Sequence, residues 1–126
     1  MTNQAQNPND KRKYDLADRT SLFGKNIIEF VLFLPKSPVN NPLVSQIVRS
    51  STSIGANYME ADCAESKKDF RHKIAICKKE AKETTHWLDM LTVADSGNKQ
   101  KYSIFRQEAH ELLLIFSSIL NNSKQL

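Results

Sequence analysis

Residues 53–88 read SIGANYMEADCAESKKDFRHKIAICKKEAKETTHWL, and this stretch decides the fold of the chain. Its first part, up to Ala64, has a helical pattern rich in Ser, Gly and Ala. Its second part repeats apolar residues at alternating steps of four and three, which is typical of one buried helix face. Between the two, Ser66 and Asp69 resemble a capping box, the sequence signal that starts a helix. The stretch therefore predicts two antiparallel helices joined by a very short turn.

Apolar residues recur every three or four positions in the flanking segments too, so we expect four helices. These helices should cover residues 15–34, 42–64 and 66–94, with a fourth after the loop at 95–98. Asn41 is the expected N-cap of the second helix, with Pro42 at its first position. Because the loops are short, the sequence predicts an all-α fold, an antiparallel up-down-up-down four-helix bundle.

Each expected helix has one stripe of residues that should face the core. The four stripes are Leu16, Thr20, Phe23, Ile27, Phe30 or Val31, and Leu34; Leu43, Ile47, Ser51, Ile54, Tyr58 and Ala61; Phe70, Ile74, Cys77, Ala81, Thr84, Leu88 and Leu91; and Phe105, Ala109, Leu112, Phe116 and Ile119.

The chain of 126 residues has the size of one domain. Residues 1–13 are polar and end in Lys11–Arg12–Lys13, so we expect a disordered tail there and a bundle domain over 14–126. No signal peptide or membrane span is recognisable, which predicts a cytoplasmic protein without a membrane partner. Cys63 and Cys77 lack metal-binding spacing and are expected to be buried free thiols.

The short turn fixes which residues of the second and third helices face each other. A turn at Glu65 and Ser66 places Ile54 opposite Cys77, and small residues around Gly55 opposite small residues of the third helix. The expected structural polar network consists of Arg49, Asn57, Glu60, Glu80 and Glu83. Acid/base catalysis by these carboxylates is the alternative, but the sequence predicts no nucleophile or cleft beside them.

Known catalytic and metal-binding patterns are otherwise missing from the sequence. One Glu-x-x-His motif occurs, Glu83 to His86, whereas the di-iron sites of four-helix bundles use two. Gly-rich phosphate loops and zinc spacings are absent as well. We therefore expect no enzymatic activity, no cofactor and no metal.

A concentrated basic face lies on the third helix. At 100° per residue its members, together with His72 and His86, fall within an arc of about 140° that holds one acidic residue, Asp89. The basic residues are Lys67, Lys68, Arg71, Lys78, Lys79 and Lys82. With a net charge of +4, this face predicts a nucleic-acid-binding site. The alternatives are a solvated Lys-rich surface and an adaptor that binds an acidic partner protein.

A second apolar stripe, offset by about 100° from the core heptad, contains Ile76, Trp87 and Met90. A bundle helix needs one apolar stripe for its own core, so the second stripe is a candidate oligomer interface. A wide core face explains the same pattern equally well.

Taken together, SIGANYMEA (53–61), SKKDF (66–70) and KEAKETTHWL (79–88) resemble the bacterial four-helix-bundle family named after proteins encoded in intervening sequences of 23S ribosomal RNA. The resemblance covers about residues 14–119, includes Arg49-Ser50, and departs at His86, where an aromatic such as Tyr is expected. The family is similar to the accessory variability protein of diversity-generating retroelements. The resemblance implies a homopentameric ring, with RNA or DNA and a reverse transcriptase or other protein as partners. For most members the function is unknown.

Overall fold

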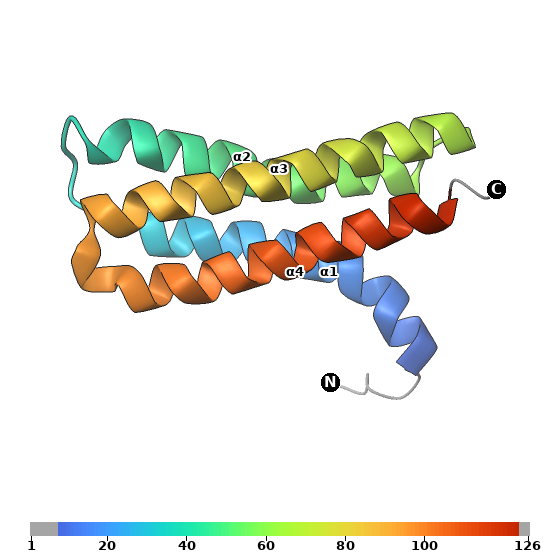
Figure 1. Ribbon diagram of the computed structural model, residues 1–126, viewed down its shortest axis with the longest axis horizontal. Coiled ribbons are helices and arrows are strands. Elements are labelled where there is room, and N and C mark those ends of the chain that lie inside the picture. The colour runs from blue at the N-terminus through green and yellow to red at the C-terminus, as the bar shows by residue number, and fades with distance from the viewer. Residues whose placement is uncertain (1–7, 124–126) are drawn as a thin grey trace.

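The computed structural model describes the backbone of residues 8–123 and the side chains of residues 16–123. This part of the chain is helical, with α1 (Pro8–Val31), α2 (Asn40–Asp62), α3 (Lys67–Ala94), the short 3-10 helix η2 (Ser96–Asn98) and α4 (Lys99–Ser123). The four long helices lie side by side and alternate in direction (Figure 1), and successive helices pack against each other. The predicted up-down-up-down four-helix bundle is confirmed.

The start of α3 agrees with the sequence, and the start of α2 does not. The Ser66 hydroxyl accepts a hydrogen bond from the Asp69 amide at 3.0 Å, as the capping signal predicted. Helix α2 begins at Asn40, so the prediction of Asn41 as its N-cap is wrong. The Ser37 hydroxyl accepts from the Asn40 amide at 2.9 Å instead, and Asn41 Oδ1 accepts from the Ser37 amide at 3.2 Å.

Helix α1 begins at Pro8, earlier than the start expected near Asp15. Proline is well tolerated at the first helical position because that amide has no partner within the helix. Residues 8–13 of the predicted disordered tail are therefore helical, and these first turns project away from the other helices (Figure 1). Residues 1–7 of the tail lie outside the described residues, as do the side chains of Lys11, Arg12 and Lys13.

The predicted stripes form the core. Most of their members are buried, and the rest pack against the buried cluster as partly exposed side chains. Tyr102, which the sequence analysis did not place in the core, is also buried, and its hydroxyl donates to Asp95 at 2.7 Å. Both cysteines are free thiols. Cys77 is buried as expected, but Cys63, the C-cap residue of α2, is exposed, so its predicted burial is wrong.

The register of α2 and α3 is as predicted. Cys77 Sγ lies 3.5 Å from the Ile54 carbonyl oxygen, and Thr84 Oγ1 donates to Ser50 Oγ at 2.9 Å. The position of Gly55 was predicted wrongly, since this residue faces α1 rather than α3. A β-carbon built at Gly55 would lie 3.4 Å from both the carbonyl carbon and Oγ1 of Thr20. The packing of α1 on α2 therefore requires a small residue at this position.

Aromatic rings and an arginine with two carboxylates connect α1 to α4. The Phe30 ring makes edge contacts with the rings of Tyr102 and Phe105, at centroid distances of 5.4 and 5.8 Å. Arg19 adds hydrogen bonds of 2.6 and 2.8 Å to the two oxygens of Glu108 and one of 2.7 Å to Glu111. The hydrogen bond to Glu108 is the main cause that raises the pKa of Arg19, with burial opposing it. This guanidinium therefore remains charged and holds two carboxylates of α4.

Candidate nucleic-acid interface

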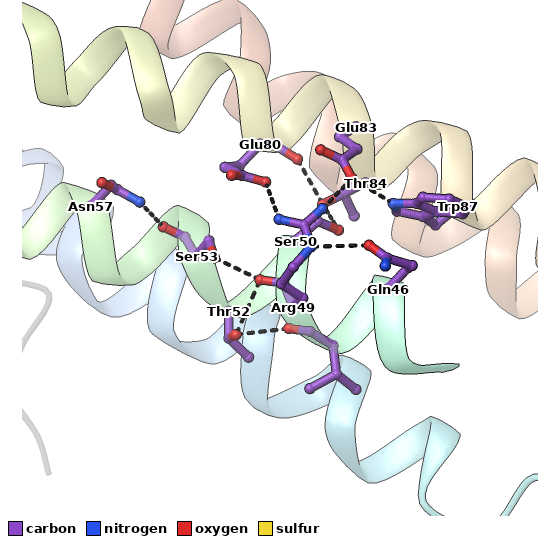
Figure 2. A network of polar contacts seen from close by, with 11 residues as sticks. Gln46, Arg49, Ser50, Thr52, Ser53, Asn57, Glu80, Glu83, Thr84 and Trp87 are labelled. Atoms are coloured by element: carbon purple, nitrogen blue, oxygen red, sulfur yellow. Dashed lines mark hydrogen bonds and ion pairs between the residues drawn. The ribbon is translucent and has the colours of Figure 1, made fainter. Parts of the chain in front are cut away.

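A polar network crosses the outer side of the α2–α3 pair. Figure 2 shows Arg49 of α2 reaching Glu80 and Glu83 of α3, with Gln46 and Trp87 beside them. The guanidinium donates to Glu80 Oε1 at 3.2 Å and to Glu83 Oε2, and its Nε donates to Gln46 Oε1 at 3.0 Å. The indole N–H of Trp87 donates to Glu83 at 2.9 Å. Arg49 thus lies near both carboxylates, as the predicted register requires.

The hydrogen bonds of Glu83 determine its protonation state. The hydrogen bond from Trp87 lowers the pKa of Glu83, burial opposes this effect, and the contact with Arg49 lowers the pKa further. Glu83 is therefore ionised at neutral pH and cannot donate a proton there. Arg49 is 43% exposed, so its ion pairs are screened by solvent and contribute modestly to stability.

Two predicted members of the network have other partners. Asn57 donates to the Ser53 carbonyl oxygen at 2.9 Å, and Ser53 donates to the Arg49 carbonyl oxygen at 2.7 Å (Figure 2), so Asn57 is linked only through the backbone of α2. Glu60 forms a separate ion pair with Lys73 of α3 at 2.7 Å. The direct network is therefore narrower than predicted and centres on Arg49.

The residues of the predicted basic face differ in whether they have partners within the protein. Arg71 points toward the end of α4, where its Nη1 donates to the Leu120 carbonyl oxygen at 2.7 Å and to Ser123 Oγ at 2.5 Å. Such bonds satisfy terminal helix carbonyls, which favour a positive charge. Arg71 thus has a structural contact where we predicted a nucleic-acid contact. Lys67 and Lys68 are exposed, and Lys67 has an interaction within the protein.

Lys78, Lys79 and Lys82 keep the arrangement that the sequence predicted. All three are exposed on α3, and among the described side chains none of the three ammonium groups forms an ion pair. They line an open groove of about 480 Å³ together with Ala75 of α3 and Leu113 of α4. The sequence analysis did not predict the apolar floor of the groove, which Ala75 and Leu113 form. Ala75 lies on the same side of α3 as the lysines and could have been found by helical projection, whereas Leu113 required the α3–α4 register.

The second apolar stripe is only partly covered within one chain. Ile76 and Trp87 are half-buried, and Trp87 packs against the core cluster while His86 lies edge-on to it at 4.8 Å between ring centroids. Met90 remains 38% exposed. Trp87 therefore agrees with the wide-core interpretation of the stripe better than Ile76 and Met90 do. Whether the stripe contacts a second copy stays a prediction.

Neither a metal site nor a membrane span is found in the described part of the chain. No group of three or more His, Cys, Asp or Glu residues there could hold a metal ion. None of the helices in that part is long and apolar enough to cross a membrane. The unpaired lysines and their groove are therefore the features that carry a functional argument.

Comparisons with known proteins support the fold and leave the activity open. The family described as 23S rRNA-intervening sequence protein matches residues 12–118. A similar solved structure is a protein of unknown function from the S23 ribosomal protein family of Bacteroides thetaiotaomicron. It has 33% sequence identity and a TM-score of 0.77, over 84% of this chain and 95% of that one. No curated protein matches the chain. Neither description names an enzymatic activity.

Proposed function

We propose that this chain, which belongs to the 23S rRNA-intervening sequence protein family, is a non-enzymatic cytoplasmic protein that binds RNA. The contacts would come from Lys78, Lys79 and Lys82 on α3. The observation that carries the proposal is that these three ammonium groups are exposed and adjacent, and that none of them forms an ion pair with a described side chain.

The contrast with the other charges strengthens this proposal. Arg19, Arg49, Lys73 and Arg106 each form an ion pair with a carboxylate of another helix, so these charges already have partners within the bundle. The three lysines form no ion pair between helices, although the charge of Lys79 contributes to lowering the pKa of Glu83 on the same helix, and keeping like charges side by side costs electrostatic energy. A phosphate backbone relieves that repulsion, because several lysines neutralise several phosphates and release their counterions. Such contacts position a nucleic acid without reading its sequence.

The test is a binding titration of the triple variant Lys78→Glu, Lys79→Glu, Lys82→Glu against structured RNA and duplex DNA. We expect RNA affinity to fall at least about tenfold, and binding by the unchanged protein to weaken steeply between about 50 and about 200 mM salt. A matched control is the triple variant Lys25→Glu, Lys36→Glu, Lys99→Glu, which makes the same charge change at exposed positions elsewhere.

Equal loss of affinity in the two triple variants would mean that net charge, rather than the α3 face, governs binding. No binding of either nucleic acid at low salt would reject the proposal. A protein partner that co-purifies at fixed stoichiometry and is lost in the α3 variant would then assign the face to the adaptor function. Circular dichroism should show unchanged helicity in both variants, because all six lysines are exposed.

For the assembly we propose a homopentamer, in which the second apolar stripe of α3 contacts a neighbouring copy. The support is the resemblance to ring-forming four-helix proteins, together with the exposure of Met90 beside the half-buried Ile76 and Trp87. A repeated head-to-tail interface either closes into a ring or forms filaments. A ring would repeat the basic groove around its circumference.

Light scattering on the purified protein checks this assembly. We expect a mass near five times the 14.4 kDa of one chain at micromolar concentration. Met90→Glu should reduce that mass, since it places a charge in an apolar contact, whereas Lys99→Glu at the exposed first residue of α4 should not. A mass near that of one chain for the unchanged protein contradicts the proposed oligomer.

A further inference from the structure

The groove beside the lysines has two chemically different sides. Lys78, Lys79 and Lys82 supply a positive rim from α3, while Ala75 and Leu113 supply an apolar floor between α3 and α4. Ala75 is exposed and Leu113 is half-buried, so the floor is open to a ligand. The volume of about 480 Å³ lies within the range of small-molecule sites. A rim for phosphates therefore lies next to an apolar surface.

Two contacts join α3 to α4 beyond the ends of the α3 segment, residues 75–82, that lines this groove. At one end Arg71 donates to the Leu120 carbonyl oxygen at 2.7 Å. At the other end Arg106 Nε donates to Asp89 Oδ1, also at 2.7 Å. The distance along α3 from Arg71 to Asp89 is about 27 Å at 1.5 Å per residue. These two bridges hold α4 against α3 on both sides of the groove.

We infer that this groove takes single-stranded RNA and seats an unpaired base on Ala75 and Leu113. The inference rests on the proposed RNA-binding function and specifies its ligand. In a duplex the bases are stacked and paired, so phosphates and sugars reach the lysines while the apolar floor stays in contact with water. An unpaired base has an open face that covers the floor while its neighbouring phosphates meet the ammonium groups. Only the single strand matches both sides of the groove.

The contribution of the base to the binding affinity distinguishes this inference from attraction between the lysines and the phosphates alone. The probes are a single-stranded RNA oligonucleotide, the same strand with its bases removed, and a duplex RNA of equal length. The abasic strand keeps the phosphates, so it measures the lysine contacts alone. We expect the intact strand to bind about fivefold or more tightly than the abasic strand, because the base removes apolar surface of Ala75 and Leu113 from water.

Position 75 provides the matched pair of variants. Ala75→Leu fills the floor with a side chain that is also a good helix former, whereas Ala75→Ser leaves the floor open. We expect Ala75→Leu to reduce the preference for the intact strand to less than about twofold, and Ala75→Ser to keep at least half of it. Duplex binding should stay the same in both variants, because the lysines are untouched. Circular dichroism and thermal unfolding confirm that each variant is folded.

The outcomes distinguish this inference from the proposed function. Equal affinity for all three probes, with loss in the triple lysine variant, overturns the base site and leaves RNA binding in place. An intact-strand preference that survives Ala75→Leu also overturns the base site. Absence of RNA binding at low salt overturns both. If poly-glutamate then binds and the triple lysine variant abolishes its binding, the groove belongs to an acidic protein partner.

Discussion

Phe116→Ala is expected to lower the free energy of unfolding by about 3–5 kcal/mol. Phe116 lies on α4, and its side chain is 0% exposed in the core of the bundle. Its ring centroid is 6.5 Å from that of Tyr58 on α2. Truncation removes buried apolar area and leaves a cavity between helices that cannot fully collapse. Because domains of this size are stable by about 5–15 kcal/mol, the variant should lose much of its stability. Urea unfolding followed by circular dichroism measures the change.

Leu114→Ala is the matched control for this result. Leu114 lies two residues earlier on the same helix but is 53% exposed, so its truncation should change the free energy of unfolding by less than about 1 kcal/mol. A comparable loss in the two variants would mean that α4 is rotated relative to the described core. The comparison therefore tests the orientation of the helix as well as the packing of one ring.

Gly55→Leu should lower the free energy of unfolding by at least about 1–3 kcal/mol. A β-carbon at this position would already lie 3.4 Å from the Thr20 carbonyl carbon and 3.5 Å from the Ser21 amide nitrogen on α1. The additional atoms of leucine have no room unless the two helices move apart. Moving them apart would disturb the buried contacts of α1 with α2. Denaturant unfolding of the purified variant gives the magnitude.

Gly55→Ala distinguishes two effects on stability, the steric overlap of a large side chain and the replacement of glycine itself. A single β-carbon makes a close but ordinary contact with Thr20, and alanine improves helix propensity by up to about 1 kcal/mol. We therefore expect this variant to be as stable as the unchanged protein or slightly more stable. Equal stability of the leucine and alanine variants would contradict the close packing of α1 on α2.

The sequence predicted those parts of the fold that depend on spacing along one helix. Ile74, Cys77, Ala81 and Thr84 recur at steps of three and four, and each is buried in the structure. The short turn at Ser66 adds a second constraint, because it fixes which residues of α2 and α3 are opposite each other. For that reason the contact of Arg49 with Glu80 and Glu83 could also be predicted.

The features that were missed depend on helices far apart in the sequence. Gly55 of α2 was predicted to face α3. A β-carbon built at this position would instead contact Thr20 and Ser21 of α1. A small residue shows that something approaches closely, but its position in the sequence does not say from which side. The same reason explains why Arg71 was placed in the basic face. Its partners, Leu120 and Ser123, are about fifty residues away and are brought near by the α3–α4 packing.

The candidate site was predicted as a charge pattern, and the structure refines it. Helical projection placed the lysines on one side of α3, where Lys78, Lys79 and Lys82 are exposed. Projection cannot decide which charges are already paired, because long side chains reach partners on other helices. It also cannot supply Leu113, since that residue joins the groove only through the packing of α4 on α3.

The division between paired and unpaired charges has an evolutionary consequence. The arginines at 19, 49, 71 and 106 each bind a group on another helix, so a mutation there removes a contact between helices. Lys78, Lys79 and Lys82 line an open groove, and exposed positions of this kind accept substitution at little cost in stability. Descendants of such a chain can acquire a new ligand through changes on α3 while they inherit the same scaffold. A shared fold in this family therefore gives no assurance of a shared ligand.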